Sequence, residues 1–156
     1  MKPSKDKIII YTDGAARGNP GPAGWGTVFI MGNKIHEIGG RADHATNNQM
    51  ELTSAIEGLK YLKKKKLSSD VEIFADSKYV ILGSTEWIHN WIKNNWKNSA
   101  NKLVLNRELW EALHELTQEF KPKWHYVKGH SGDKWNDRAD EIATSFADDE
   151  PVKLRK

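Results

Sequence analysis

The stretch Ile-Ile-Ile-Tyr-Thr-Asp-Gly (8–14) has a counterpart in Val-Glu-Ile-Phe-Ala-Asp-Ser (71–77), and each is an apolar run that ends at an aspartate. Short runs of this kind predict strands that are covered on both faces. Ligands of open α/β sheets bind beyond the carboxyl ends of the strands, so two parallel strands about 4.8 Å apart would set Asp13 and Asp76 side by side. For either residue alone, the simpler alternative is that aspartate favours the turns that follow strands.

The rest of the chain predicts a single domain of α/β or α+β class, in which a mixed sheet carries helices. Strands at 25–31 and 34–42, joined by a turn at Gly32-Asn33, extend the first run into an antiparallel meander. Helices and strands then alternate: we expect helices at 47–65, 77–82, 86–94, 103–120 and from 134 onward, and strands at 71–75 and 123–127. The domain is expected to occupy residues 1–147, with 148–156 as a flexible tail.

The composition is that of a globular protein. The chain has 156 residues, of which 38% are hydrophobic and 29% charged, and these values exclude a disordered chain and fit one domain. The net charge of +3 is weak support for a nucleic-acid partner. The lack of cysteine excludes disulfides and thiolate-bound metal. The apolar run at 8–11 is too short for a signal peptide or a membrane span, so we expect a cytoplasmic protein without membrane contact.

Two further carboxylates lie beside apolar helix stripes, where an unpaired charge is costly. Glu51 is in the first turn of the helix at 47–65, where the helix dipole alone also favours a negative charge. Asp140 lies between Ala139 and Ile142, and a salt bridge, for example with Arg138, is the alternative to a functional role. His130 lies in a glycine-flanked loop, and a single loop histidine is ordinarily just solvated.

Residues 87–107 contain no aspartate or glutamate, and tryptophans alternate there with basic residues. Basic groups follow phosphates, and aromatic faces pack against sugars or bases, so this composition favours a sequence-tolerant nucleic-acid contact. The alternative is that the tryptophans are core residues. We expect that of Trp110 and Trp124, and expect Trp91 and Trp96 at the surface. The residues concerned are Trp87, Trp91, Trp96, Lys93, Lys97, Lys102 and Arg107.

Taken together, the motifs resemble those of bacterial ribonuclease HI, over about residues 8–147. They are Tyr-Thr-Asp-Gly (11–14) with Gly-Asn-Pro-Gly-Pro (18–22), Asn-Asn-Gln-Met-Glu-Leu (47–52), Ala-Asp-Ser (75–77), Trp-Ile-His-Asn-Trp (87–91), Val-Lys-Gly-His-Ser-Gly (127–132) and Asp-Arg-Ala-Asp-Glu-Ile-Ala (137–143). The resemblance implies an RNase H-like fold, with a five-stranded mixed sheet whose first three strands are antiparallel. It also implies that Asp13, Glu51, Asp76 and Asp140 hold metal and that His130 handles the attacking water or releases product.

The implied activity is cleavage of the RNA strand of RNA–DNA hybrids with two Mg²⁺ ions, leaving 5′-phosphate and 3′-hydroxyl ends. Mn²⁺ is expected to substitute, and the protein to act as a monomer. The implied substrate contacts are Gly14, Asn19, Thr46, Asn47 and Gln49, and, in a basic protrusion, Trp87, Trp91, Lys93, Trp96 and Lys97. The chain departs from many relatives in the asparagines of its protrusion and in Lys78, which leaves hybrid affinity and one minor-groove contact open.

Two other functions compete with this hypothesis. A DNA-cutting relative would use the same carboxylate core, but the Asn-Asn-Gln segment (47–49) and the tryptophan-rich protrusion argue against it. A non-catalytic hybrid-binding module would gain nothing from a concentrated negative cluster beside a polyanion.

Overall fold

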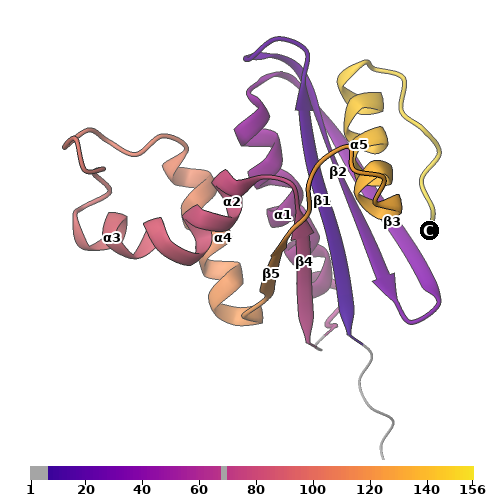
Figure 1. Cartoon of the computed structure of the whole chain (residues 1–156), viewed down its shortest axis with the longest axis horizontal. Helices are drawn as coiled ribbons and strands as arrows, with labels where there is room; N and C mark the ends of the chain where they lie inside the picture. The colour runs from indigo at the N-terminus through magenta and orange to yellow at the C-terminus, as the bar shows by residue number, and fades with distance from the viewer. Residues whose placement is uncertain (1–6, 68–69) are drawn as a thin grey trace, which may run out of the picture.

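The computed structural model describes residues 7–67 and 70–156. They form one five-stranded sheet in the order β3-β2-β1-β4-β5 (Figure 1). β1, β2 and β3 are antiparallel neighbours, whereas β4 runs parallel to β1 and β5 parallel to β4. The mixed sheet and its initial meander are therefore as predicted. The strands are β1 (Ile8–Ala16), β2 (Gly21–Met31), β3 (Lys34–Ala45), β4 (Val71–Ala75) and β5 (Lys123–Tyr126).

The meander strands are longer than predicted, because backbone pairing continues almost to the loop that joins β1 and β2. β1 extends to Ala16, which pairs with Ala23, so β2 begins at Gly21 rather than at Trp25. Pro22 is tolerated at this strand end, where its carbonyl accepts a hydrogen bond of 2.7 Å from the Arg17 amide. Gly21 is needed because a Cβ there would overlap the Arg17 carbonyl oxygen.

One face of the sheet is covered by α1 (Asn47–Lys64), close to the predicted range of 47–65. The helix begins with a capping box: the Thr46 hydroxyl accepts from the Gln49 amide at 3.1 Å, and the Gln49 side chain accepts from the Thr46 amide at 2.9 Å. Its apolar stripe, which includes Leu52 and Leu59, is fully buried against the main core.

The segment after β4 comprises α2 (Lys78–Leu82), a π-helical turn η1 (Gly83–Trp87), α3 (Ile88–Lys93) and, after a loop, α4 (Arg107–Phe120). α3 and the loop after it project away from the sheet (Figure 1), whereas α4 packs against α1 and the main core. The prediction that the fourth helix begins at Leu103 is wrong. Leu103 and Leu105 lie in the loop and are 71% and 79% exposed, and Asn106, with a left-handed backbone, precedes the first turn. Both leucines precede Asn106, so they lie outside the helix whose buried residues include Leu113 and Leu116.

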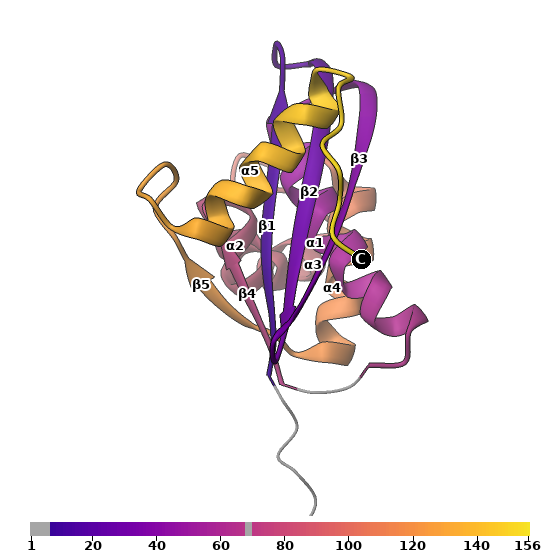
Figure 2. The same ribbon diagram turned by 90° about the vertical axis from the view of Figure 1, so that its right-hand side faces the viewer.

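The opposite face carries α5 (Lys134–Ala147), which crosses β1, β2 and β3 (Figure 2). The helix approaches the sheet closely, because a Cβ at Gly26 would lie 2.7 Å from the Ala139 carbonyl oxygen. The chain then turns back beside β3, where Val152 and Leu154 pack against the apolar cluster under α5. The flexibility predicted for residues 148–156 stays a prediction, and in the structure the last of these residues lie against α5 and β3.

Within residues 7–67 and 70–156, no helix is both long enough and apolar enough to span a membrane.

Candidate active site

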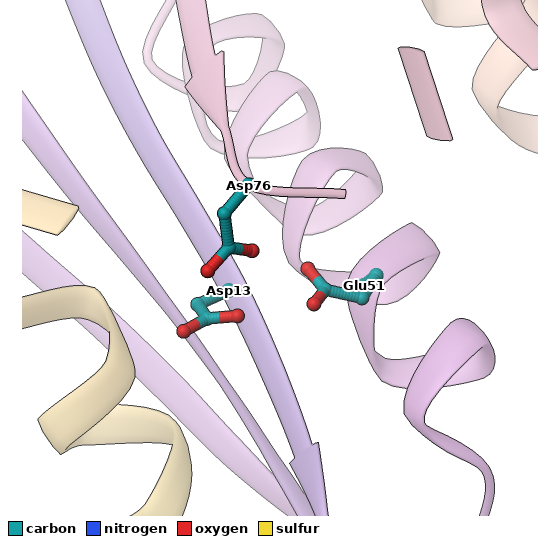
Figure 3. A group of neighbouring side chains, drawn as sticks. All are labelled: Asp13, Glu51 and Asp76. Atoms are coloured by element: carbon teal, nitrogen blue, oxygen red, sulfur yellow. The ribbon is translucent and has the colours of Figure 1, made fainter. Parts of the chain in front are cut away.

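Three acidic side chains converge at the point where β1 and β4 diverge from each other. Asp13 lies on β1, Asp76 follows the last residue of β4, and Glu51 reaches toward them from α1 (Figure 3). One carboxylate oxygen of each lies within 4.8 Å of those of the other two. Segments that are far apart in the sequence thus supply a compact cluster of oxygen ligands.

Strand register and one glycine explain this convergence. β1 and β4 pair in parallel up to Thr12 and Ala75, so the next residue of each strand, Asp13 or Asp76, comes at the same level. Glu51 is brought in by a close approach of α1 to β1: a Cβ on Gly14 would lie 2.5 Å from the Glu51 amide nitrogen. Gly14 was predicted to contact substrate, and in the structure it also sets the spacing between helix and strand.

The cluster is electrostatically unfavourable without a cation. Burial, and then the charge of Asp76, raise the pKa of Asp13 to about 8. Burial and the charges of Asp13 and Asp76 raise the pKa of Glu51 well above its ordinary value, and the pKa of Asp76 is raised chiefly by burial. Glu51 Oε1 is buried, with no hydrogen-bond partner among the described residues. An orphaned buried oxygen in an all-carboxylate set fits a divalent cation, which such hard ligands bind.

Asp140 and His130 flank the three-carboxylate cluster. Asp140, on α5, raises the pKa of Asp13 and Asp76 through its charge, so it belongs to the same electrostatic environment. Arg138, its possible salt-bridge partner, instead pairs with Glu37 and Glu141. His130 is exposed, has a left-handed backbone (φ 57°), and is close enough for its charge to lower the pKa of Asp76.

Gly129 is a site residue that the sequence reasoning missed. A Cβ at this position would lie 2.8 Å from Asp76 Oδ2, so the loop before His130 rests directly on the aspartate. The signal in the sequence was the glycine next to the loop histidine, but only the tertiary contact shows which group it accommodates.

The predicted substrate residues near the start of α1 form hydrogen bonds to the β1–β2 loop and to the loop before α4. The Asn47 amide donates to Asn19 Oδ1 at 2.9 Å, and Asn47 Oδ1 accepts from the Ala16 amide at 2.7 Å. Gln49, beyond its part in the capping box of Thr46, donates from Nε2 to Asn106 Oδ1 at 3.3 Å. These contacts hold the β1–β2 loop and the residue before α4 against the start of α1.

The projecting segment places its tryptophans differently from the prediction. Trp96 is only 8% exposed, so the expectation of a surface position is wrong: its ring packs against Trp91, 6.2 Å between centroids, and beneath the Arg107 guanidinium. Trp110 is core, as predicted, and Trp124 is half-buried against the core. Trp91 is half-buried rather than exposed.

A groove of about 370 Å³ runs along the segment, and its walls include Trp87, Trp91 and Lys97. A second hollow, of about 480 Å³, is lined by Lys93, Lys97 and asparagines. Half-buried aromatic rings and exposed lysines thus lie on one projecting surface. Trp96 is buried beneath this surface and is not part of it.

A five-stranded sheet in this order, with carboxylates beside its two central parallel strands and on the first helix, defines the class of RNase H-like folds. The family model described as RNase H matches residues 5–148. A ribonuclease H of Thermosynechococcus vestitus is 46% identical over 147 residues, which are 94% of this chain and 92% of the relative. A ribonuclease H of Erythrobacter litoralis is 47% identical over 142 residues, which are 91% of this chain and 96% of the relative. The crystal structure of LC11-RNase H1 in complex with RNA/DNA hybrid matches with a TM-score of 0.69 at 29% identity, covering 91% of this chain and 97% of that one. The chain therefore belongs to the RNase H family.

Proposed function

We propose that this protein hydrolyses the RNA strand of RNA–DNA hybrids, with divalent cations held by Asp13, Glu51 and Asp76 and completed by Asp140. The observation that carries the proposal is the cluster of three carboxylates with oxygens within 4.8 Å and raised pKa values. At 4 Å and an effective dielectric of about 20, each pair of like charges costs on the order of 4 kcal/mol, which cations would offset. Family membership and the hybrid-bound structure of a relative support the choice of substrate.

The ligand set favours Mg²⁺, with Mn²⁺ as a substitute, because every donor is a carboxylate oxygen and the chain has no cysteine. Two such ions, when bound, supply an activated water and neutralise charge on the leaving oxygen, which here would leave 5′-phosphate and 3′-hydroxyl ends. The Glu51 carboxylate faces Asp13 and Asp76 across the cluster, and its Oε1 has no hydrogen-bond partner among the described residues. His130, exposed beside Asp76, is placed to move a proton to or from the reacting groups.

Hybrid recognition would use two surfaces, the loops at the start of α1 and the projecting segment. The loops joined by Asn19, Asn47 and Gln49 offer polar groups to the RNA strand and to a phosphate, where the 2′-hydroxyl distinguishes RNA from DNA. The projecting segment offers Lys93 and Lys97 to phosphates of the DNA strand. One chain carries both surfaces and all four carboxylates, which supports action as a monomer, and the cysteine-free composition supports a cytoplasmic location.

The proposal is tested with three end-labelled substrates, an RNA–DNA hybrid, duplex DNA and duplex RNA, each incubated with Mg²⁺ or with EDTA. We expect cleavage of the hybrid's RNA strand alone, and only with the cation. Asp13→Asn should abolish cleavage and leave hybrid binding largely intact, because it removes a metal ligand but no substrate contact. Cleavage of duplex DNA instead of hybrid would reverse the substrate assignment, and Asp13→Asn activity within a few-fold of the unmodified protein would refute the ligand role.

A further inference from the structure

The last residues of the chain are fastened to the outer edge of the sheet. β3 is an edge strand, and its Glu37 amide donates to the Arg155 carbonyl at 2.8 Å, while the Arg155 amide donates to Glu37 Oε1 at 2.9 Å. Val152 and Leu154 pack on the apolar cluster between α5 and the sheet. We call residues 151–156 the C-terminal strap. It runs between α5 and β3, along the length of the helix (Figure 2).

The strap and α5 meet on one buried carboxylate. The Glu37 side chain has no exposed surface, and it accepts from Arg138 Nε at 2.8 Å and Nη2 at 2.9 Å on one side and from Arg155 Nη1 at 2.6 Å on the other. Arg138 Nη2 also donates to the Lys153 carbonyl at 2.9 Å. A carboxylate this deeply buried is costly to leave unpaired, and the two guanidinium groups offset that cost.

Arg138 and Asp140 are two residues apart on α5 and face different sides of the helix. Arg138 reaches toward β3, whereas Asp140 influences the aspartates of β1 and β4. Gly26 sets how closely the helix approaches the sheet, since its missing Cβ would meet the Ala139 carbonyl. A close approach does not by itself prevent a helix from rotating or sliding over the sheet, and the contact of Arg138 with Glu37, two residues from Asp140, restricts such movement.

We propose that the C-terminal strap positions Asp140: through Arg155, Glu37 and Arg138 it fixes the rotation of α5 and thereby the contribution of this helix to the cation site. Arg138, Glu37 and Arg155 are positioning residues, and none of them would touch substrate or cation. The inference rests on the proposed function, because that function assigns a bound cation to Asp140.

The test is cation binding without substrate, measured by titrating Mn²⁺ into the protein by calorimetry. Removing residues 151–156 should weaken Mn²⁺ binding about tenfold, the lower end of what the loss of a ligand-orienting contact costs. In an Asp140→Asn background the same truncation should cause no further loss, because the strap acts through that carboxylate. Arg155→Ala, which keeps the backbone contacts of the strap, should give a smaller change in the same direction and remains informative if the truncated chain does not fold.

Arg41→Ala is the matched control. The Arg41 guanidinium donates to the carbonyls of Phe146 and Ala147 at 3.0 and 2.6 Å, so it anchors the same helix at its C-terminal end rather than next to Asp140. It should lower thermal stability with Mn²⁺ affinity unchanged. A truncated protein that loses stability but binds Mn²⁺ normally would overturn the strap's role, as would an equal loss of affinity with and without Asp140. An unmodified protein that binds no Mn²⁺ would instead overturn the proposed function, and the strap's role with it.

Discussion

At the scale of single residues, two glycines allow neighbouring backbone segments to lie close to the carboxylates. Gly14 lets the first turn of α1 lie on β1, and Gly129 lets the His130 loop rest on Asp76. Neither has a positive φ, so the requirement is for space rather than for a left-handed backbone. A methyl group at either position would therefore act on the geometry of the cluster.

We expect Gly129→Ala to impair cation binding and cleavage far more than stability. The added Cβ would lie 2.8 Å from Asp76 Oδ2, and either the loop or the carboxylate must shift. Because the loop is at the surface, thermal unfolding should change little, whereas the Mg²⁺ concentration for half-maximal activity should rise by roughly tenfold, as for other disturbances around metal ligands. Normal Mg²⁺ dependence in the folded variant would show that the loop yields without disturbing Asp76.

At the scale of elements, the projecting segment has buried tryptophans that hold its helices together and exposed lysines that are available to a ligand. Trp96 and Trp110 are buried and pack against Trp91, which joins α3 to α4, whereas Lys93 at the end of α3 and Lys97 in the loop are exposed. The asparagines between them add polar groups without charge, so Lys93 and Lys97 would supply most of the electrostatic attraction of this surface for the hybrid.

Lys97→Ala should weaken hybrid binding at low salt and reduce the slope of log Kd against log salt concentration by about one. Binding isotherms at several salt concentrations measure both quantities. Lys64→Ala, at the exposed basic end of α1, is the matched control and should leave the slope unchanged. Equal effects of the two substitutions would mean that net charge, rather than the projecting segment, governs binding.

At the scale of the whole molecule, the carboxylate cluster opposes folding when no cation is present. The pKa of Asp13 is about 8 in the folded protein and ordinarily 3.8, so the folded state retains a proton that the unfolded chain releases. Stability present below about pH 4 is therefore lost as pH rises toward about 8. Glu37, whose pKa is lowered to about 2 because hydrogen bonds from Arg138 and Arg155 outweigh its burial, is ionised throughout that range.

In EDTA, the free energy of unfolding of Asp13→Asn should exceed that of the unmodified protein by an amount that grows from about pH 5 to about pH 8. Urea denaturation across this range measures the difference. His36 and His114 have lowered pKa values and change stability in the opposite direction near neutral pH, but equally in both proteins. With Mg²⁺ present, the order should reverse, since the cation stabilises only the intact site. A pH-independent difference in EDTA would contradict the raised pKa of Asp13.

Much of the architecture was predictable because it depends on local pattern. The runs at 8–12 and 71–75 became paired parallel strands, and the capping box at Thr46 began α1 where expected. The predictions failed where tertiary contacts outweighed local pattern. Trp96, predicted to be at the surface, is buried between Trp91 and Arg107. The helix predicted from Leu103 begins only at Arg107, and Leu103 and Leu105 are exposed in the loop before it.

The element types, the family motifs and the identity of the acidic residues could be predicted from the residues alone, because strand patterns, helix caps and acidic motifs are short-range features. The grouping of Asp13, Glu51 and Asp76 in one cluster and the contact of the strap with Glu37 could be found only in the folded chain. The physical reason is that charge coupling and close packing depend on distances between residues far apart in the chain, and those distances exist only once the sheet and helices are assembled.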